Sequence, residues 1–256
     1  MTLFLITAIL VSTLAGAPAA GNGWYVKRNN EHKQPALDAE FSFIEELDAY
    51  YVDRRHGDAD EDKVLYLTFD AGYENGNIEK ILDTLKKENV SAAFFILDNL
   101  ILRNQALVER MADEGHLVCN HTLRHKDMSR ITEESDFMRE LTALSDLYRE
   151  KTGREMAKYY RPPEGRFCKE NLVFAKKNGY KTIFWSLAYA DWDNKRQPDP
   201  EAAIRKLLEN THNGAVILLH PTSATNATIL PVLIARWREL GYRFGTLDEL
   251  TAKGVE

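Results

Sequence analysis

Residues 63–76 read KVLYLTFDAGYENG, a β-rich apolar run, Val64–Phe69, that leads directly into an aspartate and a glycine-containing loop. The next stretch places apolar residues at helical spacing, namely Ile78, Ile81, Leu82 and Leu85. A strand followed by an amphipathic helix is the unit from which parallel sheets covered by helices are built. This stretch therefore predicts the fold class of the chain around it.

The same unit recurs along the chain. Six more runs have the composition of strands: Ala92–Leu97, Leu117–Asn120, Lys158–Arg161, Thr182–Leu187, Ala215–His220 and Arg243–Gly245. Several helices between them are expected to end on a glycine, which adopts the left-handed conformation easily, as at Gly115, Gly179 and Gly241. About seven such units favour an α/β fold with a parallel (β/α) barrel over an open, doubly wound sheet.

The composition fits one sizeable globular domain. The chain has 256 residues, of which 44% are hydrophobic and 28% are charged. The net charge is −6 and no run of Lys or Arg forms a stripe, so nucleic acid is not an expected partner. The two cysteines, Cys119 and Cys168, are too few for a disulfide framework. They form either one bridge or, as we favour, two buried thiols.

The segment Met1–Gly21 is apolar and carries no charged side chain. Its apolar part, Leu3–Leu14, has the length of a signal-peptide core, and small residues that fit a cleavage site follow it at Ala15, Ala17 and Ala19. The usual basic residues before the core are missing, so an N-terminal anchor or a buried helix stays an alternative. No later segment looks transmembrane. We expect a secreted or extracytoplasmic protein, membrane-tethered if residues 1–21 are retained, with no stable transmembrane span in its mature form.

The rest of the chain divides into two parts. Residues 22–62 are polar and mixed, without clean periodicity, and are interpreted as an N-terminal arm leading to the domain. Residues 63–256 hold the strand–helix units and the polar clusters described next, so we assign them as the catalytic domain. A monomer is expected.

Polar clusters fall at the carboxyl ends of the predicted strands. They are Asp70, Asn120-His121, Arg161-Pro162-Pro163, Asp191-Trp192 and His220. In a parallel barrel these ends converge on one face, where active sites are built. Five clusters with side chains that can transfer protons, bind a metal or carry charge therefore predict one catalytic site.

His121 and His125 are spaced i and i+4 directly after a predicted strand. If the chain is helical from Thr122 onward, both imidazoles lie on one helix face, one turn apart. That spacing is typical of ligands to zinc or a similar cation, although two incidental surface histidines would show the same spacing.

Asp70 and Arg161 form a second candidate pair. The Asp70 carboxylate could serve as a general base or a metal ligand, or it could only cap the following turn. Two prolines after Arg161 stiffen the backbone and fix the direction of its side chain. If Arg161 lies beside Asp70, it keeps that carboxylate ionised; otherwise it makes an ordinary surface ion pair.

His220 follows an apolar run, Val216–Leu219. It could act as an acid with a pKa near neutrality, or it could be a hydrogen-bonded core histidine. Asp191 could orient His220 and raise its pKa, as a carboxylate does for imidazole in hydrolases.

Taken together, these segments resemble the polysaccharide deacetylase family, also called NodB homology or carbohydrate esterase family four. The resemblance covers roughly residues 63–250 and implies a distorted parallel (β/α) barrel of the NodB-homology type. Five short motifs carry it, in the family's order: Thr68–Gly72 for T-F-D-D-G, His121–His125 for the histidine motif, Arg161–Gly165 for R-P-P-x-G, Asp191-Trp192, and Leu218–His220 for L-x-H.

The resemblance implies catalytic and substrate-binding roles. Asp70 would be the general base on the attacking water, and Arg161 would orient and tune it. His220, with Asp191 behind it, would protonate the departing amine. Further residues would bind the substrate: a backbone N–H near Glu164 as an oxyanion hole, Trp192 and Leu218 as walls of the acetyl pocket, and Tyr73.

The resemblance also implies a divalent metal, Zn²⁺ first and Mn²⁺ or Co²⁺ as alternatives, bound by His121 and His125. The metal would polarise the acetyl carbonyl. The family's second Asp, normally the third ligand, is Ala71 here, and a methyl group cannot coordinate. Either Asp70 binds the metal directly or Glu74 reaches in from the loop, so the affinity and identity of the metal stay open.

Residues 68–76, the RPPEG motif and the arm residues look like one subgroup of the family, the PdaA-like delta-lactam-biosynthetic de-N-acetylases of the spore cortex. The arm residues concerned are Trp24, Tyr25, Lys27, Arg28, Asn29 and His32. This resemblance implies a peptidoglycan glycan strand as partner and removal of the acetyl group from N-acetylmuramic acid, the step that permits muramic delta-lactam formation in sporulation. Arg166 could pair with the lactyl carboxylate of that sugar, or it could be a solvated arginine.

Three other functions fit parts of the sequence. The sugar could be N-acetylglucosamine, in peptidoglycan or in a chitin-type polymer. Ala71 could mark a sugar-binding pseudoenzyme without metal, although a binding protein has no need for a full acid–base set. A xylan O-acetyl esterase would share the fold and the metal but would cleave esters rather than amides.

Overall fold

The computed structural model describes residues 21–252, and their central feature is one sheet of parallel strands. The sheet order is β2-β8-β6-β5-β4-β3-β10-β9, with β11 paired to the first half of β3. The strands are β2 (Ala49–Tyr50), β3 (Lys63–Ala71), β4 (Ala93–Ile96), β5 (Leu117–Asn120), β6 (Ala157–Tyr160), β8 (Lys181–Ile183), β9 (Leu187–Ala188), β10 (Ala215–Leu219) and β11 (Tyr242–Phe244). The predicted α/β class is confirmed. The predicted signal segment or anchor lies outside the described residues except for Gly21.

The sheet curls into a distorted barrel, so that its two edge regions lie close together. Only three residues, 184–186, connect β8 at one side with β9 at the other. The run predicted as one strand, Thr182–Leu187, is divided between β8 near one edge and β9 at the other. The backbone N–H of Phe184 donates to β2 at 2.7 Å, whereas the N–H of Ser186 donates to β10 at 3.0 Å. Residues so close in sequence can bond to both sides only if the two sides lie near each other. The predicted distorted (β/α) barrel is therefore confirmed, with short extra strands.

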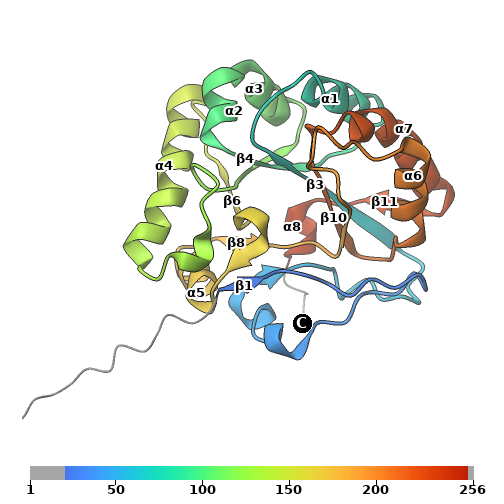
Figure 1. Cartoon of the computed structure of the whole chain (residues 1–256), viewed down its shortest axis with the longest axis horizontal. Coiled ribbons are helices and arrows are strands. Elements are labelled where there is room, and N and C mark those ends of the chain that lie inside the picture. Colours follow the sequence, from blue (N-terminus) through green and yellow to red (C-terminus); the bar gives the residue numbers. More distant parts are fainter. Residues whose placement is uncertain (1–20, 253–256) are drawn as a thin grey trace, which may run out of the picture.

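Helices cover the outside of the sheet (Figure 1). They are α1 (Ile78–Lys87), α2 (Asp98–Arg103), α3 (Gln105–Asp113), α4 (Glu134–Thr152), α5 (Lys169–Lys177), α6 (Pro200–Glu209), α7 (Ala224–Glu239) and α8 (Leu247–Leu250). Short 3₁₀ turns are η1 (Ala39–Phe41), η2 (Glu45–Leu47), η3 (Met128–Arg130) and η4 (Pro163–Gly165). The predicted glycines follow α3, α5 and α7 with φ of +81° at Gly115, +76° at Gly179 and +86° at Gly241. Their left-handed conformation ends each helix just before the next strand.

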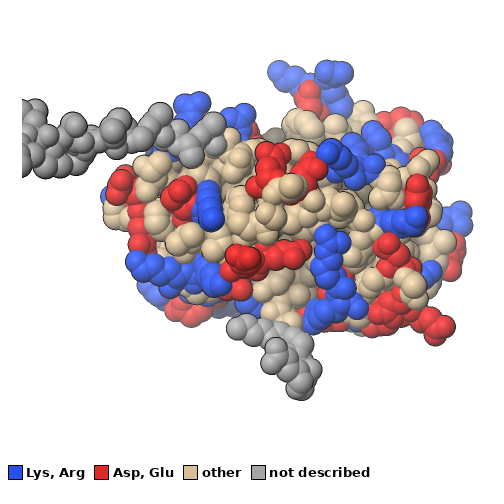
Figure 2. Space-filling model, turned by 90° about the horizontal axis from the view of Figure 1, so that it is seen from below, with Lys and Arg blue, Asp and Glu red and all other residues tan. Residues whose placement is uncertain are grey.

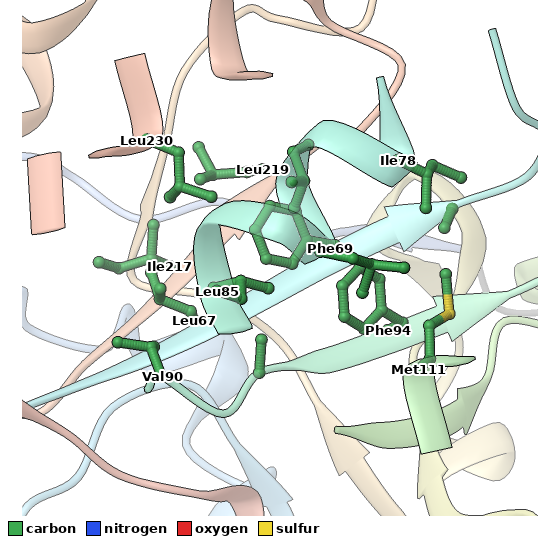
Figure 3. Packing of buried hydrophobic residues seen from close by; sticks show 14 of the residues in the cluster. Leu67, Phe69, Ile78, Leu85, Val90, Phe94, Met111, Ile217, Leu219 and Leu230 are labelled. Atoms are coloured by element: carbon green, nitrogen blue, oxygen red, sulfur yellow. The ribbon is translucent and has the colours of Figure 1, made fainter. Parts of the chain in front are cut away.

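The side chains of β3 alternate between two apolar layers. Leu67 and Phe69 face the helices, where Phe69 stacks on Phe94 with ring centroids 5.0 Å apart (Figure 3). Tyr66 faces the other way and packs inside the barrel. Burial of each large apolar side chain contributes about 1.5–3 kcal/mol. By the same alternation, Asp70 points to the inner side of the sheet, toward the end of the barrel.

The N-terminal arm packs against the sheet. Its β1 (Asn22–Gly23) pairs antiparallel with β7 (Arg166–Phe167), and β2 joins the main sheet. Trp24 is buried, stacks on Phe184 with ring centroids 4.4 Å apart, and donates from Nε1 to the carbonyl of Trp185 at 2.9 Å. Single large side chains, rather than a periodic apolar face, therefore anchor this segment, which explains its irregular sequence pattern.

The surface carries charges of both signs. On the face seen in Figure 2, Lys and Arg are interspersed with Asp and Glu, as expected from a sequence in which no run of Lys or Arg forms a stripe. Cys119 and Cys168 are both unpaired and buried, as favoured above. Every helix within residues 21–252 is too short or too polar to span a lipid bilayer.

Candidate active site

The polar clusters predicted at strand ends meet at one cavity of about 810 Å³. Asp70 lies near the end of β3, His121 directly after β5, and His220 directly after β10. The predicted site residues that line the cavity are Asp70, His121, His125, Glu164, Trp192, Leu218 and His220. They converge because the carboxyl ends of parallel strands meet on one face of a barrel.

Arg161 holds Asp70 in a buried ion pair. It directly follows β6 and is fully buried, and its Nη1 donates to Asp70 Oδ1 at 2.8 Å. Nη2 donates to Thr68 Oγ1 at 2.9 Å and to the Phe184 carbonyl at 3.3 Å, and Nε donates to the Ile183 carbonyl at 2.9 Å. These bonds satisfy a charge that would otherwise be costly to bury, and they fix the direction of Asp70.

The Asp70 carboxylate is ionised despite its burial. Its side chain is only 9% exposed. Burial raises the pKa of Asp70, but Arg161 and the imidazoles of His121 and His220 lower it by more, and the net pKa lies below the usual value of aspartate. Asp70 is therefore able to accept a proton at neutral pH.

His220 is held by Asp191, a buried residue in the loop after β9. Asp191 accepts from His220 twice, with Oδ1 from Nδ1 at 2.7 Å and with Oδ2 from the backbone N–H at 2.8 Å. Asn226 in α7 also donates to Asp191 Oδ2, at 2.6 Å. Burial lowers the pKa of His220, but Asp191 raises it by more, so the net pKa lies above the usual value. The imidazole is suited to carry and release a proton near neutral pH.

His121 and His125 approach each other through a loop, not a helix. Thr122 and His125 have φ of +70° and +55°. The condition of a helix from Thr122 onward is therefore not met, because left-handed residues cannot continue a right-handed helix. Asn120 Oδ1 accepts from the Thr122 N–H, and Thr122 Oγ1 accepts from the His125 N–H. This turn still brings the two imidazoles together, with ring centroids 5.2 Å apart.

The backbone fixes the tautomer of His121. Its Nδ1–H donates to the Arg161 carbonyl at 2.9 Å, which leaves Nε2 as an acceptor, 3.5 Å from Asp70 Oδ2. Burial lowers the pKa of His121 to about 4, although Asp70 opposes the shift. The ring is neutral at pH 7, which is the state in which an imidazole binds a metal.

The side chains present nevertheless do not fit a three-ligand metal site. Within residues 21–252, no three His, Cys, Asp or Glu side chains are grouped so that they could hold a metal ion. The methyl group of Ala71 lies in the core against the helices. Glu74 accepts from the backbone N–H that opens α1, at 3.0 Å, and does not line the cavity. Asp70 already pairs with Arg161, so the histidine motif supplies only two candidate donors, the imidazoles of His121 and His125.

Two residues predicted to bind substrate do not line the cavity. Tyr73 is 44% exposed and accepts a hydrogen bond from Asn194. Arg166 pairs with Glu164 at 3.0 Å and with Asp127 at 3.3 Å, which satisfies its charge outside the cavity. Tyr73 lies in the loop after β3 and Arg166 opens β7, and sequence proximity to a motif does not show which way their side chains point.

The other predicted substrate-binding residues lie on the cavity wall. Trp192 is 62% exposed, and its ring centroid lies 6.2 Å from that of His220. Leu218 is buried at the end of β10, and Glu164 has a φ of +55° in the short η4 turn. The wall therefore has an apolar part, made by Trp192 and Leu218, and a polar part to which Glu164 belongs.

Nine residues line the cavity without having been assigned to the site: Trp24, Tyr25, Val26, Arg28, Trp185, Ala188, Tyr189, Ala190 and Lys206. Trp24, Tyr25 and Arg28 reach it from the arm, and Lys206 reaches it from α6. The resemblance had singled out Trp24, Tyr25 and Arg28 without placing them. No sequence signal pointed to Lys206, because a lysine on an amphipathic helix is normally solvated.

Comparison with known proteins gives a consistent result. Residues 57–183 match the sequence profile of the family described as Polysaccharide deacetylase. The chain is 35% identical over 246 residues to the peptidoglycan-N-acetylmuramic acid deacetylase PdaA of Bacillus subtilis, covering 94% of this chain and 91% of that protein. It is 41% identical over 228 residues to an uncharacterised 30.6-kDa protein of Geobacillus stearothermophilus. This match covers 89% of this chain and 84% of that protein.

The fold is also similar to solved structures. The structure of Bacillus subtilis PdaA, described as a family 4 carbohydrate esterase, aligns with a TM-score of 0.84 at 35% identity, covering 91% of this chain and 98% of that one. A family 4 carbohydrate esterase from Bacillus anthracis aligns with a TM-score of 0.72 at 33% identity. This alignment covers 90% of this chain and 96% of that one.

Proposed function

The chain belongs to the polysaccharide deacetylase family, and from this premise we propose that it removes the N-acetyl group from N-acetylmuramic acid residues of peptidoglycan. One observation carries the proposal: an ionised carboxylate, Asp70, and a proton-bearing imidazole, His220, face the same cavity and are each held by a buried partner. The similarity to PdaA supports muramic acid as the sugar. In this proposal the product is set up for delta-lactam formation in spore cortex, outside the cytoplasmic membrane.

The reaction follows from the two held groups. Asp70 takes a proton from water, and the resulting hydroxide attacks the acetyl carbonyl to give a tetrahedral intermediate. The protonated His220 gives its proton to the nitrogen, the C–N bond breaks, and acetate and a free amine leave. Arg161 keeps Asp70 ionised and fixes its direction, and Asp191 orients His220 and raises its pKa.

The cavity wall would position the acetyl group. Leu218 and Trp192 would flank its methyl group, and a backbone N–H near Glu164 would stabilise the oxyanion. A divalent metal, with zinc first and manganese or cobalt as alternatives, stays a prediction from the resemblance. No step is assigned to it, because the side chains present do not complete its ligand set.

The test is mass spectrometry of muropeptides after treatment of peptidoglycan with the protein. We expect muramic residues to lose the mass of an acetyl group replaced by hydrogen, with the release of acetate. Loss from glucosamine residues alone would favour the second sugar, and activity on acetylated xylan alone would favour an esterase. Parallel assays with a chelator and with added Zn²⁺, Mn²⁺ or Co²⁺ test the metal. No release of acetate with any metal would favour a sugar-binding protein.

A further inference from the structure

We propose that Arg28 and Lys206 form a carboxylate-binding subsite on the cavity wall, which selects glycans that carry an anionic group. The inference rests on the proposed function, because it names a part of the substrate that the same cavity recognises. It concerns binding and specificity rather than the hydrolytic step.

The charge balance of the cavity points to these two residues. Asp70 is neutralised by Arg161, and Glu164 pairs with Arg166. Arg28 and Lys206 also line the cavity, yet their side chains make no ion pair or hydrogen bond with any other residue between 21 and 252. The cavity wall therefore carries two positive charges that are not matched within this part of the protein, and they attract an anion.

The arm holds Arg28 in place between two anchors. On one side, the N–H of Trp24 donates to the Gly165 carbonyl at 2.8 Å. On the other side, His32 Nδ1 bonds to the carbonyl of Thr211 at 2.8 Å. Thr211 lies just beyond the end of α6, the helix whose last turn carries Lys206. The arm thus runs from the third motif to the end of this helix, which brings both cations to one cavity.

Neighbouring residues show that this arrangement is selective. Lys27 precedes Arg28 but pairs with Asp38 at 2.8 Å and does not line the cavity. Arg205 precedes Lys206 and is exposed away from the cavity lining. Each proposed subsite residue therefore has a positively charged sequence neighbour outside the cavity. Lys27 serves as the control for Arg28, and Arg205 serves as the control for Lys206.

The ligand chemistry is that of a carboxylate near the reacting sugar. A lactyl group on muramic acid supplies one directly, whereas a peptide attached to that group supplies carboxylates further away, and glucosamine has neither. Arginine binds a carboxylate through two parallel N–H groups, and lysine adds a second positive charge. Arg166, predicted from sequence for this purpose, is already paired with two carboxylates.

The test compares binding of three ligands by isothermal titration calorimetry, in a His220→Asn background so that the glycan is not consumed. The ligands are a tetrasaccharide of alternating N-acetylglucosamine and N-acetylmuramic acid, its lactyl methylamide, and the same glycan with peptide attached. We expect the carboxylate form to bind about tenfold more tightly than the methylamide. In R28Q/K206Q this ratio falls to about one, while K27Q/R205Q retains it.

Two results would overturn the subsite. One is an affinity ratio of carboxylate to methylamide ligand that stays the same in R28Q/K206Q. The other is a parent protein that binds neither carboxylate-bearing ligand more tightly than the methylamide. Preference for the free lactyl form identifies the lactyl group as the source of the carboxylate, and preference for the peptide form identifies the peptide. All four side chains are exposed, so melting temperatures should match the parent. The proposed function fails separately, when the protein with His220 intact releases no acetate from muramic residues.

Discussion

Arg161 is the residue on which the charge balance of the cavity depends. Its guanidinium is buried and neutralises Asp70. We expect Arg161→Met to lower the free energy of unfolding by about 3–5 kcal/mol, because it leaves a buried carboxylate without a countercharge. Urea denaturation near neutral pH measures this effect.

A second substitution separates charge from packing. Adding Asp70→Asn to Arg161→Met removes the stranded carboxylate, so we expect the double variant to be more stable than Arg161→Met alone. If the double variant is the less stable of the two, the cost lies in the lost hydrogen bonds of Arg161 to Thr68 and the backbone, and not in the charge.

Asp191 is expected to set the pH range of activity through His220. It raises the pKa of His220 against the opposing effect of burial. In Asp191→Asn that pKa falls, so the imidazole loses its proton at a lower pH and the alkaline limb of the kcat/KM profile moves to lower pH. We expect a loss of about 10²- to 10⁴-fold at neutral pH, the usual contribution of a general acid.

The control for this prediction is Asp193→Asn, in the same loop but bonded only to the backbone at Lys195. An alkaline limb that stays in place in Asp191→Asn would show that His220 is not the acid. Measurement of acetate release between pH 5 and pH 10, with about one-unit steps across the range where histidine titrates, gives the profile.

At the scale of the elements, Gly165 sets how closely the arm can approach the barrel. It has a φ of +65°, and an added Cβ would lie 2.8 Å from Trp24 Cβ and 2.9 Å from the Trp185 ring. We expect Gly165→Ala to push the arm away, with a cost of about 1–3 kcal/mol for overpacking beyond the backbone strain. Thermal and urea unfolding measure the cost, and the affinity for carboxylate-bearing glycans should fall with it.

Gly153, just after α4, provides the matched control. Its φ is +69°, almost the same, but an added Cβ would meet nothing within 4 Å. Gly153→Ala therefore carries the backbone strain alone. Equal destabilisation by the two substitutions would mean that contact with the arm contributes nothing at Gly165.

Elements were predicted well where the pattern is local. The strand at Leu117–Asn120 has the predicted bounds, and glycines end three helices as expected. The run Thr182–Leu187 was wrongly read as one strand, because its division between β8 and β9 depends on hydrogen bonds to β2 and β10. A helix after Thr122 was only a condition of the prediction from sequence, because the i, i+4 spacing of His121 and His125 does not reveal the left-handed residues that make this segment a loop.

At the scale of the whole molecule, the position of the site was predictable and its wall was not. Parallel strands bring their carboxyl ends together whatever the sequence between them, so Asp70, His121 and His220 could be expected at one cavity. Arg28 and Lys206 reach the same cavity through the path of the arm. That path is set by Trp24 packing on Phe184, a contact between distant residues that no local pattern encodes.

The stability of the whole molecule should depend on pH through two histidines outside the cavity. Burial lowers the pKa of His116 from its usual value of 6.5 to about 4, and burial lowers the pKa of His212 from 6.5 to about 4 as well. Above pH 6.5 neither state of the protein protonates these rings. As the pH falls from 6.5 to 4, the unfolded chain binds protons that the folded chain does not, so the free energy of unfolding decreases.

Each ring should contribute a loss of about 3 kcal/mol over that interval, since each pKa unit corresponds to about 1.4 kcal/mol. His116 tests this directly, because its ring is buried beside Phe94 and accepts from the Ala92 N–H. We expect His116→Gln to reduce the slope of the unfolding free energy against pH between pH 6.5 and pH 4. The slope above pH 7 should not change. Urea titrations at several pH values measure both slopes. A slope identical to that of the parent would mean that His116 protonates equally in both states, and that the acid sensitivity comes from other groups, such as His212, His121 or the carboxylates.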